Sequence, residues 1–220
     1  EILLSAKGIS KTFQGKKVLD NINIDIMKSE VVAITGLSGA GKTTLLNILS
    51  TLDKPDSPND SSLLISNHDV FNLNNNNLSK LRNEMIGFVF QFHELIPELS
   101  ILENVCLPAW IKKDNEAEMK AKELLKYFGL IDLINKKPST LSGGEKQRAA
   151  IARSLINNPN IIFADEPTGN LDSKNSKMLF DLFFKLRDDY NCSVVIVTHN
   201  ESNANICDRK LLIVDGKIKK

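Results

Sequence analysis

A glycine-rich segment carries the clearest chemical signal in the chain. Residues 36–43 have the form GxxxxGK[ST] and lie between an apolar run and a stretch with helical character. The glycines let successive backbone N–H groups face one anion, and the start of the helix adds a partial positive charge. Lys42 can reach the β- and γ-phosphates of a nucleotide, and the Thr43 hydroxyl can bind Mg²⁺. The residues expected to hold the nucleotide here are Gly36, Ser38, Gly39, Ala40, Gly41, Lys42, Thr43 and Thr44.

Two adjacent acidic residues follow a second apolar run at 161–164. A carboxylate at the carboxyl end of a parallel strand points into the ligand crevice, so Asp165 can hold Mg²⁺ through water. Glu166 can polarise a water molecule for in-line attack on the γ-phosphate. The alternative is a pair of surface acids at a strand end, and the phosphate loop in the same chain favours the catalytic interpretation.

Residues 141–145 contain a second helix start. Ser142 and Glu145, three residues apart, have the pattern of a capping box. Gly143 and Gly144 between them leave the backbone amides open to an approaching anion, so this helix start is also suited to phosphate. Capping boxes are common, and an ordinary N-cap without a ligand is the alternative.

Two further polar residues end apolar runs. His199 follows the run at 194–197, where it can donate to the γ-phosphate or orient the water, although a lone histidine is usually structural. Gln91 follows the run at 86–90 and is a candidate ligand of the same metal on spacing alone.

The two helix starts suited to phosphate differ in one respect. Only the first has the lysine and threonine of a complete nucleotide site. A two-fold dimer accounts for the difference, because the Ser142 region of one chain then completes the Lys42 site of the other.

The hydrophobic pattern predicts the elements that position these residues. Alternation at 22–26 predicts a half-buried strand, and the apolar runs at 31–34, 161–164 and 194–197 predict buried strands. Helices are expected at 42–52, 117–128 and 178–186, and Asp215-Gly216 predicts a hairpin turn. No convincing strand falls within 95–155. We therefore expect an α/β core with a mainly parallel sheet and a helical insertion.

The composition excludes several function classes. The 220 residues include 28 Lys and Arg against 27 Asp and Glu, a net charge of +1, which disfavours a nucleic-acid partner. The three cysteines form no CxxC pair, which indicates neither a zinc site nor a disulfide framework and favours a reducing compartment. No apolar run approaches the ~18–20 residues of a transmembrane segment.

Together, these motifs resemble those of the ATP-binding subunit of an ABC transporter over essentially the whole chain. The resemblance identifies residues 36–43 as the Walker A loop, Gln91 as the Q-loop, and 141–145, continued by Gln147 and Arg148, as the signature. It also identifies 161–165 as Walker B and 169–172 as the D-loop.

The resemblance also implies roles and a fold. Glu166 is the catalytic glutamate and His199 the switch histidine, with ATP and Mg²⁺ as cofactors and Lys42 and Gln91 assisting catalysis. Two ATP molecules lie at the interface of a head-to-tail homodimer, which closes on ATP binding and reopens on hydrolysis. The implied fold is a P-loop NTPase core with a small antiparallel β subdomain and an inserted α-helical subdomain. We place the core and β subdomain at 1–94 and 156–220, and the helical subdomain at about 95–155.

Two residues near the N-terminus complete the nucleotide site by resemblance. Phe13 occupies the adenine-stacking position, where many relatives carry tyrosine, and stacking needs only the ring. Val18 is expected beside the base or ribose, with a core valine as an equal alternative.

The segments 51–56, 88–99 and 102–105 resemble the ATPase of the lipoprotein-releasing system. That resemblance implies a peripheral subunit on the cytoplasmic face of the bacterial inner membrane, which drives lipoprotein extraction by two membrane subunits. The alternatives are the ATPase of a macrolide or peptide exporter, or of a cell-division ABC complex. ABC proteins that act on ribosomes or DNA usually carry two cassettes or a long coiled coil, which 220 residues do not accommodate. A module that senses ATP without turnover is disfavoured by Glu166.

The segment 91–105 is the expected docking surface for the membrane subunits. Its apolar side chains, close to Gln91, are Phe92, Leu95, Ile96, Leu99 and Ile101. We expect some of them in the core of the helical subdomain and others in an exposed groove that receives a partner helix.

Overall fold

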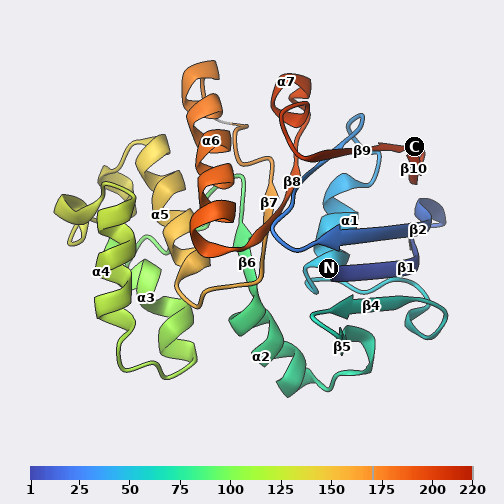
Figure 1. Cartoon of the computed structure of the whole chain (residues 1–220), viewed down its shortest axis with the longest axis horizontal. Helices are drawn as coiled ribbons and strands as arrows, with labels where there is room; N and C mark the ends of the chain where they lie inside the picture. The colour runs from blue at the N-terminus through green and yellow to red at the C-terminus, as the bar shows by residue number, and fades with distance from the viewer. Residues whose placement is uncertain (170, 220) are drawn as a thin grey trace.

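The computed structural model describes residues 1–169 and 171–219, which form two sheets with helices between and beside them (Figure 1). The strands are β1 (Ile2–Phe13), β2 (Lys16–Met27), β3 (Val31–Thr35), β4 (Ser62–Ile65), β5 (His68–Asp69), β6 (Ile86–Val89), β7 (Ile161–Asp165), β8 (Ser193–Val197), β9 (Arg209–Val214) and β10 (Lys217–Lys219). The α-helices are α1 (Lys42–Leu49), α2 (Asn75–Met85), α3 (Ile101–Ile111), α4 (Ala117–Tyr127), α5 (Gly143–Leu155), α6 (Ser173–Tyr190) and α7 (Glu201–Ala204). Short 3₁₀ turns are η1 (Pro58–Asp60), η2 (Val70–Asn72), η3 (Ile131–Leu133) and η4 (Pro138–Thr140).

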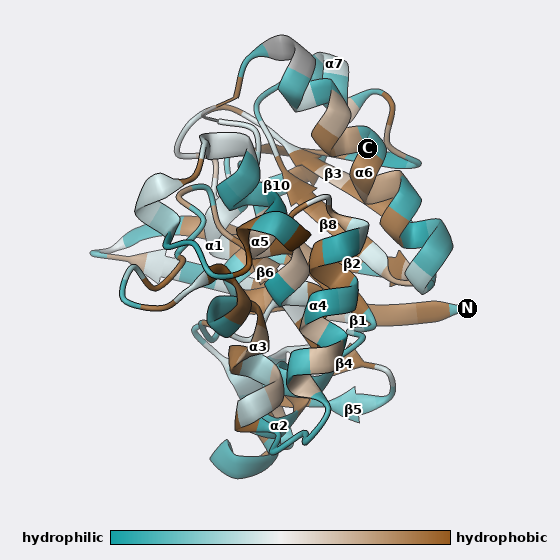
Figure 2. Cartoon of the chain, turned by 90° about the vertical axis from the view of Figure 1, so that its left-hand side faces the viewer, coloured by the Kyte–Doolittle hydropathy of each residue, from teal (hydrophilic) through white to brown (hydrophobic). Residues whose placement is uncertain are grey.

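The larger sheet has the strand order β10-β9-β3-β8-β7-β6 and is parallel from β9 to β6. Its central strands are buried on both faces, as their continuous apolar runs predict. Alternate residues enter different cores: Val194 and Ile196 pack into one, and Val195 and Val197 into the other. Figure 2 shows hydrophobic colour along β3 and β8, two of these central strands.

The smaller sheet is antiparallel, with the order β2-β1-β4-β5. In β2 the predicted alternation is confirmed, because Ile22, Ile24 and Ile26 are buried while Asn23 and Asp25 are exposed. Helix α1 shares one core with both sheets, since its buried leucines cluster with residues of β1, β2, β3 and β8. The helix that follows the phosphate loop is therefore fixed on two sides.

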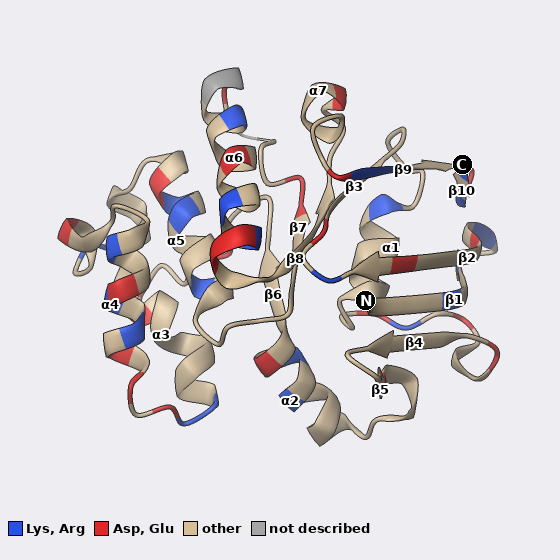
Figure 3. Ribbon diagram, in the orientation of Figure 1, with Lys and Arg blue, Asp and Glu red and all other residues tan. Residues whose placement is uncertain are grey.

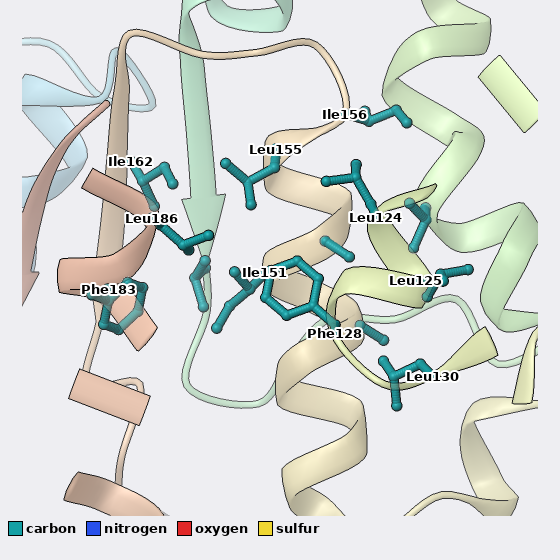
Figure 4. Packing of buried hydrophobic residues seen from close by; sticks show 14 of the residues in the cluster. Leu124, Leu125, Phe128, Leu130, Ile151, Leu155, Ile156, Ile162, Phe183 and Leu186 are labelled. Carbon is teal, nitrogen blue, oxygen red and sulfur yellow. The ribbon is translucent and has the colours of Figure 1, made fainter. Parts of the chain in front are cut away.

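The opposite face of the parallel sheet is covered by α3, α4, α5 and α6. Figure 4 shows Ile151 and Leu155 of α5 between Ile162 of β7 on one side and residues of α4, such as Leu124, on the other. Residues 95–155 contain helices and 3₁₀ turns but no strand, as the sequence pattern predicts. The α/β fold with a mainly parallel sheet, a small antiparallel sheet and inserted helices is confirmed.

Two local details differ from or extend the sequence prediction. Helix α1 ends at Leu49, earlier than the predicted residue 52, because Thr51 adopts a left-handed backbone with φ of 66°. The asparagine run at 74–77 begins a helix, where the Asn74 side chain accepts a hydrogen bond from the Asn77 backbone N–H as an N-cap.

The outer surface of the helical region carries mixed charge. Figure 3 shows acidic and basic residues following one another along α4, where Lys122 pairs with Glu118 at 2.6 Å. Among the described helices, none combines the length and apolar character that a membrane span requires.

Candidate functional site

Four neighbouring parallel strands bring the predicted site residues to one edge of the sheet. β3 leads into the phosphate loop, β8 into the segment of His199, β7 ends at Asp165, and β6 is followed closely by Gln91. The strands lie side by side in the order β3-β8-β7-β6, with Asp165 in register with Val197. Adjacent strands are about 4.8 Å apart, so the residues that follow them form one row.

The phosphate loop depends on glycine at its start. Gly36 has a φ of 150°, and a Cβ there would come within 2.4 Å of the Ile213 carbonyl oxygen on β9. Lys42 is almost fully buried, and its Nζ donates to the carbonyl oxygens of Gly36 and Leu37 at 3.0 and 3.1 Å. The ammonium group is therefore held inside the curl of the loop, where it can interact with a phosphate.

Thr43 and Asp165 meet next to the loop. The Thr43 hydroxyl donates to Asp165 Oδ1 at 3.2 Å, joining the start of α1 to the end of β7. Burial raises the pKa of the Asp165 carboxyl, and the neighbouring charge of Glu166 acts in the same direction. A cation beside these two oxygen atoms would reverse this effect, because an opposite charge favours the ionised carboxylate.

Glu166 and His199 form a direct pair. His199 Nδ1 lies 2.8 Å from Glu166 Oε2, and the His199 backbone N–H donates to the same oxygen at 3.3 Å. The histidine side chain is 72% exposed, whereas that of the glutamate is 16% exposed. Glu166 also has a left-handed backbone with φ of 44°, fixed by its N–H bond to Val197, a conformation that the sequence pattern did not indicate.

Gln91 lies against the segment that follows Glu166. A Cβ on Gly169 would come within 2.8 Å of the Gln91 Nε2 atom, so the absence of a side chain at 169 lets the two segments approach closely. Of the predicted D-loop at 169–172, Asn170 lies outside the described residues.

The predicted signature begins helix α5. Ser142 Oγ accepts from the Glu145 N–H at 3.3 Å, and Glu145 Oε2 accepts from the Ser142 N–H at 2.7 Å, which completes the capping box. These bonds lower the pKa of the Glu145 carboxyl. Gly143 has open space where a side chain would lie. Figure 1 shows α5 on the opposite side of the parallel sheet from α1, so one chain does not bring its signature to its own phosphate loop.

Val18 lies beside the phosphate loop, and Phe13 lies at the end of the strand that pairs with β2. Val18 lines a cavity of about 250 Å³ together with Ser38, Gly39 and Ala40. Phe13, at the end of β1, is 47% exposed. Val18 is therefore beside the loop rather than in the central core, and Phe13 is partly accessible to solvent.

A larger cavity of about 490 Å³ lies between the parallel sheet and the inserted helices. Residues that line it include Phe88, Phe90, Glu94, Pro108, Ile111 and Arg153. Among the described residues, this lining includes none of the five apolar side chains predicted for the groove. Of those, Ile101 is fully buried and Phe92 is 68% exposed.

Arg153 connects this cavity to the segment after Gln91. From the last turn of α5, its guanidinium donates to the carbonyl oxygens of Glu94 at 2.5 Å and His93 at 2.9 Å. Both residues have left-handed backbones, with φ of 48° and 66°. Sequence reasoning missed this contact, because its partners are 59 and 60 positions apart and no local pattern links them.

Comparison with known proteins agrees with this geometry. The ABC transporter family matches residues 19–169. The chain is 50% identical over 218 residues to the lipoprotein-releasing system ATP-binding protein LolD of Cytophaga hutchinsonii, with 98% of each chain covered. It is 50% identical over 220 residues to the protein of the same name from Bacteroides thetaiotaomicron, covering 99% of this chain and 100% of the relative.

Two solved structures are similar throughout. One is the dimeric structure of MJ0796, a bacterial ABC transporter cassette, with a TM-score of 0.88, 40% identity and coverage of 99% of this chain and 97% of the other. The other is a dimeric post-hydrolysis state of MJ0796 bound to ADP and Pi, with a TM-score of 0.87, 40% identity and the same coverage. The chain belongs to the ABC transporter family, as one of its ATPase subunits.

Proposed function

We propose that this chain is the ATP-hydrolysing subunit of a bacterial ABC transporter that releases lipoproteins from the inner membrane. The observation that carries the ATPase mechanism is the row of phosphate loop, Asp165, Glu166 and His199 along one sheet edge. Full-length similarity to two LolD proteins supports lipoprotein release as the process it powers.

The proposed chemistry assigns each group a separate task. The loop amides and Lys42 bind the β- and γ-phosphates. Thr44, in the first turn of the same helix, is a further residue proposed to hold the nucleotide. Glu166 accepts a proton from the attacking water, and His199 orients Glu166 and donates toward the γ-phosphate. The Glu166–His199 distance of 2.8 Å already provides the contact this division requires.

The residues present fit a magnesium ion. Mg²⁺ prefers a few hard oxygen ligands and completes its coordination with water and substrate phosphates. The Thr43 hydroxyl and the Asp165 carboxylate, 3.2 Å apart, provide two such oxygens, and we propose Gln91 as a third protein contact. The ion would neutralise charge on the phosphates when bound.

A homodimer is needed to complete the proposed site. Ser142, Gly143, Gly144 and Glu145, at the start of α5, lie on the far side of the sheet from the phosphate loop of the same chain (Figure 1). In a head-to-tail dimer these groups of one protomer contact the nucleotide bound by its partner. The dimeric state of the MJ0796 cassette supports this arrangement.

The membrane partner is proposed to dock in the 490 Å³ cavity between sheet and helices. Ile111 is 71% exposed at its rim, and Phe88 and Phe90 stack with ring centroids 4.2 Å apart. An apolar helix end from a permease fits such a groove. Residues 95–155 would then act as one helical subdomain that carries the signature, and the chain would lie on the cytoplasmic face of the inner membrane.

The experiment is affinity capture of the tagged chain from gently solubilised native membranes, followed by mass spectrometry. We expect two related permease subunits and a lipoprotein to co-purify. Ile111→Glu should abolish capture, whereas Met119→Glu, an exposed position on α4 outside the cavity, should not.

Other outcomes would change specific parts of the proposal. Recovery of a macrolide or peptide exporter, or of a cell-division membrane protein, would keep the ATPase mechanism and replace the cargo. Recovery of ribosomes, or of no membrane protein, would contradict the transport role. Equal loss of capture in both variants would contradict the proposed docking cavity.

A further inference from the structure

The loop that follows α1 is tied to the end of β1 by a set of polar contacts. Lys11 is largely buried, and its Nζ bonds to Asp53 Oδ1 and Oδ2 at 2.9 Å and to the Lys54 carbonyl oxygen at 2.6 Å. The Asp56 backbone N–H donates to the Ser10 carbonyl oxygen at 2.9 Å.

The same ammonium group also faces an aromatic ring. Lys11 Nζ lies 5.3 Å from the centroid of the Phe13 ring, two residues along the same strand. This distance is within the range of cation–π attraction. Asp53 bonds to the same cation, so a residue of the loop after α1 is linked through Lys11 to the Phe13 ring.

Helix α1 links this arrangement to the phosphate loop. The helix begins at Lys42, inside the loop, and ends at Leu49, four residues before Asp53. Its core residues Leu45, Leu46, Ile48 and Leu49 are fully buried, so the helix is a rigid spacer of about 12 Å. One short helix therefore fixes the distance between the phosphate loop at its start and Asp53, which contacts Lys11, in the loop after its end.

We propose that Lys11 and Asp53 are a positioning pair that holds the Phe13 ring as the platform for the nucleotide base. The proposal rests on the proposed function, in which Phe13 stacks on adenine. Lys11 occupies one face of the ring and leaves the opposite face for the base. The pair contributes to ATP affinity through the ring and does not act on the phosphates.

The test is steady-state ATP hydrolysis by Lys11→Met, Asp53→Asn and the double variant. A cation–π contact contributes about 0.5–1 kcal/mol, so the KM for ATP should rise about two- to five-fold. kcat at saturating ATP should stay unchanged, and Asp53→Asn should give a similar rise. The double variant should be no worse than Lys11→Met, because both changes remove one interaction. Lys11→Arg should restore most of the affinity.

A ligand without a base separates this effect from general damage to the site. Inorganic tripolyphosphate should inhibit the wild type and Lys11→Met with the same inhibition constant. Lys7→Met, an exposed lysine on the same strand, should change neither constant. A parallel loss of tripolyphosphate binding in Lys11→Met would overturn the proposal, because it would mean that the phosphate loop had moved.

Phe13→Ala distinguishes the positioning pair from the base platform itself. We expect Phe13→Ala to raise the KM for ATP, and Lys11→Met to add nothing in that background. A raised KM in Phe13→Ala with an unchanged KM in Lys11→Met would overturn the positioning pair alone. Unchanged KM values in both would overturn the adenine platform and the pair together.

Discussion

Replacing Arg153 by alanine removes the contact between the signature helix and the segment after Gln91. In the wild type, the Arg153 guanidinium bonds to the carbonyl oxygens of His93 and Glu94 at 2.9 and 2.5 Å. Both carbonyls belong to residues in left-handed conformations, which non-glycine residues adopt at a cost. We expect Arg153→Ala to let this segment relax to another conformation.

The expected loss of stability is the difference between two contributions, the lost hydrogen bonds and the released backbone strain. Two hydrogen bonds from a charged donor stabilise the observed conformation by roughly 3–6 kcal/mol in total. Two left-handed residues cost roughly 2–4 kcal/mol, which is recovered when the segment relaxes. The net loss of stability is about 1–2 kcal/mol, or a fall in Tm of about 2–8 °C for a chain of this size. Local opening of the segment should become about 5- to 30-fold more frequent.

Hydrogen exchange measured by mass spectrometry tests this prediction directly. Peptides that cover Glu94 and Ile96, whose N–H groups bond to Phe92 O and Asn104 Oδ1, should exchange faster in Arg153→Ala. ATPase activity should fall in parallel, because Gln91 lies on the same segment.

Two control variants define what would refute the reasoning. Arg187→Ala removes a guanidinium that bonds to Asp208 on another part of the chain, so it should lower Tm without changing exchange near Glu94. Arg153→Lys keeps the charge but lacks the planar fork that spans two carbonyls, so it should restore only part of the protection. Unchanged exchange near Glu94 in Arg153→Ala would show that other contacts hold these left-handed residues.

Three further predictions concern the nucleotide site. Glu166→Gln keeps the side-chain shape but removes the base, so ATP turnover should fall by about 10²–10⁴-fold and an ATP-bound dimer should accumulate; light scattering that detects only monomer at saturating Mg²⁺ and ATP would contradict this. Burial raises the pKa of the Asp165 carboxyl, so the folded state favours the protonated acid. The stability that this protonated group contributes is lost as the pH rises through the raised pKa, because the buried carboxylate must then ionise. Asp165→Asn should therefore raise the metal-free Tm more at pH 7 than at pH 4 while abolishing Mg²⁺-dependent hydrolysis, and calorimetry that finds equal Tm changes at both pH values would refute the assignment. Ser142→Ala removes the N-cap of α5 and should cost about 1 kcal/mol of stability and weaken ATP-dependent dimerisation in sedimentation experiments; wild-type values of both would exclude a role for the cap.

The local sequence pattern was sufficient to predict that the polar residues after buried strands lie together at one edge of the sheet. The apolar runs before Asp165 and His199 identify parallel strands, and the carboxyl ends of parallel strands meet at one sheet edge. The 2.8 Å contact of His199 with Glu166 is a geometric consequence of β7 and β8 being neighbours. The left-handed backbone of Glu166 was not foreseeable, because that conformation is rare for glutamate and arises from tertiary contacts.

Contacts between residues far apart in the sequence could not be predicted, because no local sequence pattern links the two partners. Lys11 and Asp53 are 42 positions apart, and a lysine in a strand or an aspartate in a loop is ordinary by itself. The predicted groove at 91–105 could not be divided into buried and exposed side chains for a similar reason. An apolar side chain such as Ile101 has the same sequence signature whether it is buried or lines a groove, and here it is buried.

These distant contacts share an arrangement that explains how two helices serve the site. Helix α1 begins at the phosphate loop, and the loop after it holds Lys11 and thus the Phe13 ring. Helix α5 begins at the signature, and its last turn holds the segment after Gln91 through Arg153. Because a helix is stiff along its axis, a shift at the start of either helix must also move the contact at its other end. In the proposed dimer, closure on ATP would therefore act on the segment after Gln91 and on the proposed docking cavity through α5, while α1 would keep the proposed sites of the base and the phosphates in fixed relation.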